Sequence, residues 1–246
     1  MSVTASPPDG PDLPGGPLPP AGPVSSIAAA IAKMAAFDAA LPSTDGLACF
    51  NRMYLDVTRK VNAQLEASFY ADPDFMTELD VTFANLYFEA ADAAADPKAV
   101  PQAWRPLIEK RGDPGIEEIQ FALAGMNAHI NHDLPEAVVR TCLKLATAPE
   151  ADPHYEDYTK VDELLDAAEQ AIRQAFENPD ERAIDRHVAA VVTLTCNWTM
   201  NCARDLAWNN SLLLWALRRD DYPRKLFLNS LATATEIASK MLLVAV

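Results

Sequence analysis

Apolar residues recur every three to four positions along most of the chain, which is the spacing of one face of an α-helix. No run of alternating β-branched residues predicts a strand. We therefore expect an all-α protein, with helices over residues 24–41, 47–69, 74–95, 101–110, 116–133, 136–147, 156–176, 184–218 and 222–244. The segment 184–218 is apolar nearly all round, as is typical of a central helix. The pattern predicts a single globular multi-helix domain with a buried long helix near the C-terminus.

The first 23 residues have a different composition, with eight prolines and four glycines. Such a segment buries too little surface to offset its chain entropy. We expect a disordered or extended arm over residues 1–23 and one all-helical domain over 24–246. The arm has neither the basic nor the apolar region of a secretory signal, and Glu236 and Lys240 interrupt the apolar C-terminus. These features predict a cytoplasmic protein.

Charge and glycine content exclude several kinds of ligand. The formal net charge is -15, and such a surface repels phosphate backbones and anionic lipids, so nucleic acid and membranes are not expected partners. The glycines after residue 23 form no phosphate-binding motif, so no nucleotide cofactor is expected. The four cysteines form no C-x-x-C pair, which argues against a disulfide framework and a zinc knuckle.

Two segments place polar residues where helical spacing predicts the interior. Asp80 falls on the core side of helix 74–95, and a buried carboxylate needs a partner, a metal or a catalytic task. In helix 184–218, Asn197, Asn201, Arg204, Asp205 and Trp208 share one stripe. This stripe could line an internal cavity, with Arg204 pairing with an anionic group and Trp208 forming a wall; the alternative is that it is the solvated face of the helix.

The segment GMNAHINHDLP, residues 125–135, is the strongest candidate for chemistry. His129 and Asp133 are four residues apart, and His129 and His132 are three apart, so the three side chains can converge beside one helix. This spacing suits zinc or iron ligands, and it also suits a histidine that a carboxylate orients for proton transfer. Gly125 precedes His129 by one turn and predicts the close approach of a backbone or a ligand.

A structural interpretation of the same segment competes with the functional one. Asp133-Leu134-Pro135-Glu136 has the form of a capping box, with Asp133 as the N-cap of the next helix. Histidines at the end of the preceding helix would also interact favourably with its dipole. The sequence leaves open whether Asp133 caps a helix or serves a site.

Four segments carry a resemblance to a known family: FNRMYLDVTRKV, FMTELDVTFANLYFEA, AWRPLIEKR and IQFALAGMNAHINHDLP. Over roughly residues 30–220 the chain resembles an actinobacterial and fungal family, domain of unknown function 5995. The resemblance implies that these segments form one domain. It implies no reaction, substrate or cofactor.

The H-x-x-x-D spacing is also similar to part of the zinc-binding set of the all-helical phospholipase C and nuclease P1 family. The three-zinc site of that family needs a second such pair, whereas His154 and His187 are followed four residues later by Tyr158 and Val191. A site with one or two metal ions stays open, with ligands drawn from His129, His132, Asp133 and Asp80. Haem is not expected, because only His129 and Gly125 would favour it.

We therefore expect an enzyme with an internal pocket centred on His129, which acts on a small, partly apolar substrate. Asp80 and Asp133 would be the carboxylate partners of His129 in metal-assisted or acid-base chemistry. The reaction would be a hydrolysis, or a cyclisation or elimination in a biosynthetic pathway. Binding of the substrate would involve Arg204, Asn201, Trp208, Tyr87 and Gly125, with Phe83 and Met126 as further walls. The alternative is a non-catalytic helical module that binds a ligand or a protein.

Overall fold

The computed structural model describes residues 21–165 and 200–245, and in these ranges it contains helices and no β-strand. The predicted all-α class is therefore confirmed. None of the described helices is both long and apolar enough to cross a membrane. The helices are α1 (Ile27–Ala40), α2 (Gly46–Glu66), α3 (Pro73–Asp92), η1 (Ala93–Ala95), η2 (Gln102–Trp104), α4 (Arg105–Lys110), α5 (Glu118–Ala128), η3 (His129–Asp133), α6 (Leu134–Lys144), α7 (His154–Lys160), α10 (Met200–Ala216) and α11 (Asp221–Leu242).

Acidic caps define the starts of two helices that carry the site. The side chain of Asp72 accepts a hydrogen bond from the backbone N–H of Phe75, and Pro73 opens α3, as the Asp-Pro pair predicts. Helix α2 is capped by Asp45, whose side chain accepts a hydrogen bond from the backbone N–H of Leu47. The carboxylate of Asp45 also pairs with Arg111 at 2.7 Å, so this buried charge is compensated.

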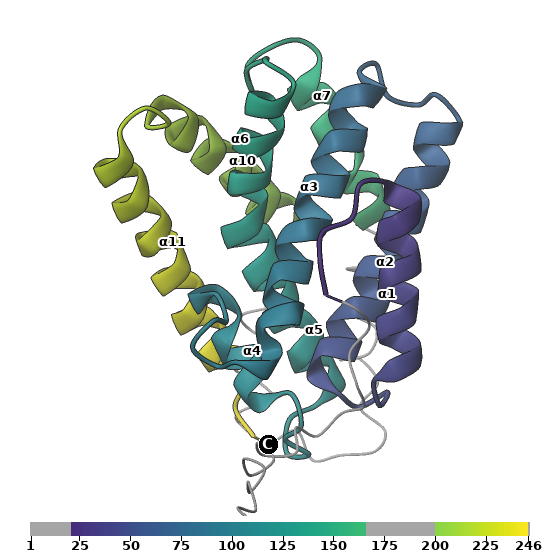
Figure 1. Ribbon diagram of the computed structural model, residues 1–246, viewed down its shortest axis with the longest axis vertical. Helices are drawn as coiled ribbons and strands as arrows, with labels where there is room; N and C mark the ends of the chain where they lie inside the picture. The colour runs from purple at the N-terminus through teal and green to yellow at the C-terminus, as the bar shows by residue number, and fades with distance from the viewer. Residues whose placement is uncertain (1–20, 166–199, 246) are drawn as a thin grey trace, which may run out of the picture.

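Helices α5 and α6 form the centre of the fold. Figure 1 shows α3 beside α6, with α1 and α2 on one side of the molecule and α11 on the other. Helix α5 packs against α2 and α11, and α6 packs against α3 and α10. The prediction had placed a long C-terminal helix in the centre. In its described part, α10, Leu206 and Leu213 are more than half exposed, so one face of this helix is not covered as a central helix would be.

The two central helices are one continuous helix, joined through a π turn at His129–Asp133 (η3). The N–H of Leu134 bonds to the carbonyl of His129, five residues back. We attribute the wider turn to Pro135, which has no N–H to donate and whose ring would clash with the carbonyl of residue 131 in a regular α-helix. The predicted boundary between two helices at this point was therefore wrong.

Residues 1–20 of the predicted arm lie outside the described residues. The chain just after them is attached to α3: the N–H of Gly22 donates to Asp92, and the backbone of Val24 exchanges two hydrogen bonds with the side chain of Asn85. Lys33 on α1 binds both Asp92 and the carbonyl of Gly22. These bonds fix the entry of the chain into the helical domain.

Candidate active site

His129 is buried at the centre of an aromatic cluster. Its imidazole stacks on the ring of Phe83, with centroids 3.5 Å apart and an angle of 4° between the planes. The ring of Tyr54 meets it edge-on, with centroids 4.5 Å apart. Contacts on both sides hold the imidazole in one orientation, so the direction of each ring nitrogen is set by packing.

Asp133 holds His129 through a network of three hydrogen bonds. Its Oδ2 accepts from His129 Nδ1 at 3.0 Å and from Trp104 Nε1 at 2.9 Å, and its Oδ1 bonds to His132 Nδ1 at 2.7 Å. Burial alone would raise the pKa of Asp133, but the hydrogen bonds from His129 and His132 lower this pKa to about 2. Asp133 is therefore an ionised acceptor. Its side chain makes no capping bond, so of the two interpretations that the sequence leaves open, the capping box is not formed.

The charge on Asp133 decides the tautomer of His129. An ionised carboxylate can only accept, so Nδ1 of His129 carries the proton and Nε2 has a free lone pair. Nε2 is buried and has no hydrogen-bond partner among the described residues. Burial lowers the pKa of His129, and the bond to Asp133 compensates only in part. His129 is thus a neutral imidazole with an unpaired basic nitrogen buried inside the protein.

His132 differs from His129 in its position and its charge. Its side chain is 15% exposed, and it does not line the cavity described below. Burial lowers the pKa of His132, but the hydrogen bond and the charge of Asp133 raise it more, so that the net shift is upward. His132 therefore balances the buried charge of Asp133 from the solvent side.

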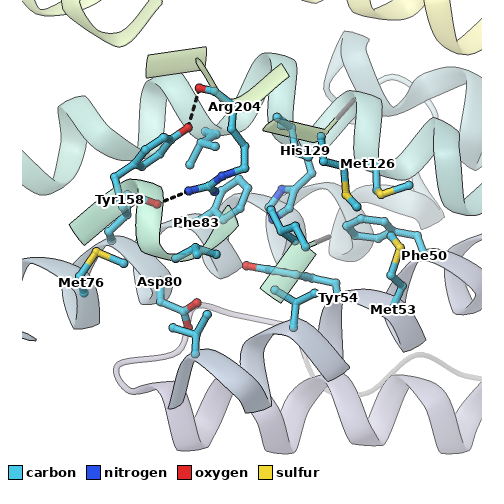
Figure 2. Close-up of a pocket in the computed structure, with 18 residues that line it drawn as sticks. Phe50, Met53, Tyr54, Met76, Asp80, Phe83, Met126, His129, Tyr158 and Arg204 are labelled. Carbon is cyan, nitrogen blue, oxygen red and sulfur yellow. Dashed lines mark hydrogen bonds between the residues drawn. The ribbon is translucent and has the colours of Figure 1, made fainter. Parts of the chain in front are cut away.

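His129 lines a largely apolar cavity of about 80 Å³ (Figure 2). Asp80 and Arg204 line the same cavity, so the predicted meeting of these three residues is observed. The remaining walls come from aliphatic, aromatic and sulfur-containing side chains. They are Phe50, Met53, Tyr54, Val57, Val61, Met76, Leu79, Phe83, Met126, Ile130, Leu134, Tyr158, Val161, Leu165 and Met200.

Asp80 is a carboxylate without a charged partner among the described residues. Its Oδ2 is buried and makes no hydrogen bond there, and burial raises the pKa of Asp80 to about 7. Asp80 therefore stays protonated in part at neutral pH and can donate a hydrogen bond into the cavity.

Arg204 lies on the wall of the cavity but already has partners. Its Nε donates to Asp162 Oδ1 at 2.5 Å, its Nη2 donates to the carbonyl of Tyr158 at 2.5 Å, and its guanidinium lies 4.0 Å from the centre of the Tyr158 ring. Figure 2 shows the bonds that join Arg204 and Tyr158. These contacts hold α10 against α7, so Arg204 has a structural role besides the predicted contact with a substrate.

Four other residues predicted to bind the substrate do not line this cavity. The hydroxyl of Tyr87 donates to Asn51, and Trp208 packs against Tyr155 and Tyr158 beside a separate depression. Asn201 lies outside the lining. At Gly125, a Cβ atom would overlap the ring of Phe50, so this glycine admits a side chain and neither a backbone nor a ligand. Asn197 lies outside the described residues.

Two contributors to the site were not chosen as site residues from the sequence. Trp104 lies 29 positions before Asp133 in the sequence and donates a hydrogen bond to it. The only sequence feature that pointed to Trp104 was its place in AWRPLIEKR, one of the segments that carry the family resemblance. The hydroxyl of Tyr54 is buried with no hydrogen-bond partner among the described residues. Helical spacing allows Tyr54 to offer its hydroxyl to an interior pocket, but it favours an ordinary core tyrosine, because tyrosines at such positions usually lie in the core with the hydroxyl satisfied.

The predicted metal ligands do not form a metal site. Within the ranges 21–165 and 200–245, no three His, Cys, Asp or Glu side chains are placed to hold a metal ion. Both oxygens of Asp133 already accept hydrogen bonds from Nδ1 of His129 and of His132. His154 binds the carbonyl of Ala148 and the carboxylate of Asp72, and His187 lies outside the described residues.

Removing the Asp80 carboxylate is expected to stabilise the protein at neutral pH. Its pKa is raised from 3.8 to about 7, so the folded state retains a proton that the unfolded state has released. The contribution of protonated Asp80 to the stability of the folded state is therefore fully present below about pH 4, and it is lost as the pH rises through about 7. Asp80→Asn should gain about 1 kcal/mol at pH 8 and almost nothing at pH 4, measured by urea denaturation. Asp38→Asn, at an exposed position on α1, is the control. Equal stability of wild type and Asp80→Asn at both pH values would show that the carboxylate is solvated or paired.

Comparison with known proteins identifies the family of this chain. No curated protein and no solved structure matches the chain. A family model described as "Family of unknown function (DUF5995)" matches residues 27–245, which includes every described residue of the cavity and of the Asp133 network. The protein therefore belongs to this family, DUF5995.

Proposed function

We propose that the protein is an enzyme that moves a proton on a small, largely apolar substrate bound in the cavity, with His129 as the general base. One observation carries this proposal: Nε2 of His129 is buried in the cavity wall without a hydrogen-bond partner among the described residues, while Nδ1 is held by ionised Asp133. A base held in one tautomer by a carboxylate is ready to take a proton and to be stabilised as an imidazolium.

The residues that line the cavity favour proton transfer over covalent catalysis. Among the described residues, the lining includes no serine, threonine, cysteine or lysine, the usual nucleophiles. The thiols of Cys49 and Cys142 lie elsewhere, and burial raises their pKa values to about 11 and about 12. An isomerisation, cyclisation or elimination needs only an acid and a base, which Asp80 and His129 can supply.

The cavity indicates the kind of substrate. Its walls are hydrocarbon, aromatic and thioether groups, so most of a bound molecule must be apolar. Four methionines, Met53, Met76, Met126 and Met200, contribute to the lining, and their flexible side chains can adapt to ligands larger than 80 Å³. A few polar groups then fix the orientation of the substrate.

Incubation in D₂O with an organic extract of the producing cells tests the proposal. The enzyme should cause at least one extracted compound to gain deuterium at carbon or to change into an isomer, as detected by high-resolution mass spectrometry and NMR. Extracted compounds that bind the protein, measured by thermal shift, but undergo no change would contradict the proposal and favour the non-catalytic binding module.

We also propose a cytoplasmic location, an actinobacterial or fungal source and a step in a biosynthetic pathway. The cytoplasmic location is supported by the cysteines, which form no disulfide pattern in the sequence. The actinobacterial or fungal source is supported by the family resemblance. An apolar substrate that is isomerised or cyclised is typical of biosynthesis. Cell fractionation with an antibody against the protein would test the location.

A further inference from the structure

Two polar groups in the cavity have no role in positioning His129. The Tyr54 hydroxyl and Asp80 Oδ2 are both buried, and neither has a hydrogen-bond partner among the described residues. They come from neighbouring helices, α2 and α3, and Figure 2 shows the Tyr54 hydroxyl directed toward the side of the cavity where Asp80 lies. Buried polar atoms without partners are rare in folded proteins, and they cluster where a ligand supplies the partner.

We propose that Asp80 and Tyr54 together bind the carbonyl oxygen of the substrate, which makes the substrate a largely apolar ketone or a related carbonyl compound. This inference rests on the proposed function, because the bound carbonyl group would make the neighbouring carbon acidic enough for His129 to take its proton. Both donors would point at the oxygen on which negative charge develops, as in sites that stabilise an enolate.

The step balances without any further reactant. Nε2 of His129 takes a proton from the carbon next to the carbonyl, and the electron pair of the broken C–H bond forms a C=C bond. The carbonyl π electrons move to oxygen, which then accepts hydrogen bonds from Asp80 and Tyr54. Return of the proton from His129 to the same or a conjugated carbon restores the base and yields an exchanged or isomerised product.

The protonation states of both donors suit this role. Burial raises the pKa of Asp80 to about 7, so the carboxyl carries a proton to donate at and below neutral pH. Burial also raises the pKa of Tyr54 well above 10, and the charge of Asp80 adds to the shift, so the phenol stays protonated. Arg204 cannot replace them readily, since its guanidinium already binds Asp162 and the Tyr158 carbonyl.

Binding of 4-nitrophenol tests the proposal, because its phenolate resembles an enolate and absorbs visible light. Wild-type protein should bind the probe and shift it toward the phenolate form at a pH where the free probe is mostly neutral. Tyr54→Phe, which keeps the ring packing, should weaken binding of the phenolate about 10- to 100-fold. Asp80→Asn should also weaken it, and His129→Gln should bind the probe without ionising it.

Tyr87→Phe is the matched control, because Tyr87 is an equally buried tyrosine whose hydroxyl donates to Asn51 and does not line the cavity. Its affinity for the phenolate should stay within about twofold of the wild type. Equal affinities for the wild type, Tyr54→Phe and Asp80→Asn would overturn the oxygen-binding role. The two proposals can fail separately. Deuterium incorporation together with equal probe binding by all variants would support His129 as a base and contradict the oxygen-binding role. Probe ionisation that depends on Tyr54, without any turnover, would support the binding site and contradict the proposed enzyme.

Discussion

His129→Gln is expected to lower the rate of proton transfer by about 10²- to 10⁴-fold, the usual contribution of a general base. Glutamine is similar in size and polarity but cannot take the proton as an imidazole does. The rate would be measured as deuterium incorporation into the substrate identified by mass spectrometry. Circular dichroism and thermal unfolding should show that the variant is folded, because glutamine can still bond to Asp133.

His132→Gln is the control for this experiment. His132 binds the same carboxylate as His129 but does not line the cavity, so its loss should change the rate less than about tenfold. A His129→Gln protein with wild-type activity would remove the catalytic role of His129. Equal losses in the two variants would place the effect in the charge balance around Asp133 and not in a base at Nε2.

Asp133→Asn is expected to lower the stability by about 3 kcal/mol, because a buried charge that holds three donors is replaced by a neutral amide. Trp104 can only donate, so the amide oxygen should keep facing Trp104 and His129, while the NH₂ group turns to His132. His129 would then keep its proton on Nδ1 but lose the charge that stabilises the imidazolium. We expect the proton-transfer rate to fall about 10- to 100-fold.

Chemical denaturation and ¹⁵N NMR of the histidine rings test this prediction together. The NMR spectrum should show His129 unchanged, with the proton on Nδ1, and His132 changed to the tautomer with its proton on Nε2. Unchanged stability would mean that the Asp133 network is not formed in solution. A change of the tautomer at His129 would mean that the amide has the opposite orientation, and the loss of rate should then be larger.

Much of the fold followed from local sequence features. Helical spacing predicted a helix over residues 74–95, and α3 covers Pro73–Asp92. The same spacing placed Asp80 toward the interior, where it lines the cavity with His129. These predictions succeed because a side chain's direction on a regular helix depends only on its position in the sequence.

The π turn is where this local argument failed. Asp133 and Pro135, two residues later, suggested that one helix ends and another begins, but the chain accommodates Pro135 with a wider turn and continues. Packing of α5 and α6 against the surrounding helices compensates for the poorer turn, and sequence spacing alone contains no information about such contacts.

The sequence by itself determined an all-α protein, a histidine and a carboxylate four positions apart on one helix, and an acidic residue on the inner face of another. Only the tertiary structure decided what these groups do. Trp104 and His132 turn Asp133 from a potential cap into a shared, ionised acceptor, and the position of Tyr54 adds a second donor to the cavity. The same packing directs Tyr87 and Trp208 to other partners. Hydrogen bonds between distant segments depend on how whole helices pack, and so spacing along one helix could locate the proposed base, His129, but not its complete surroundings.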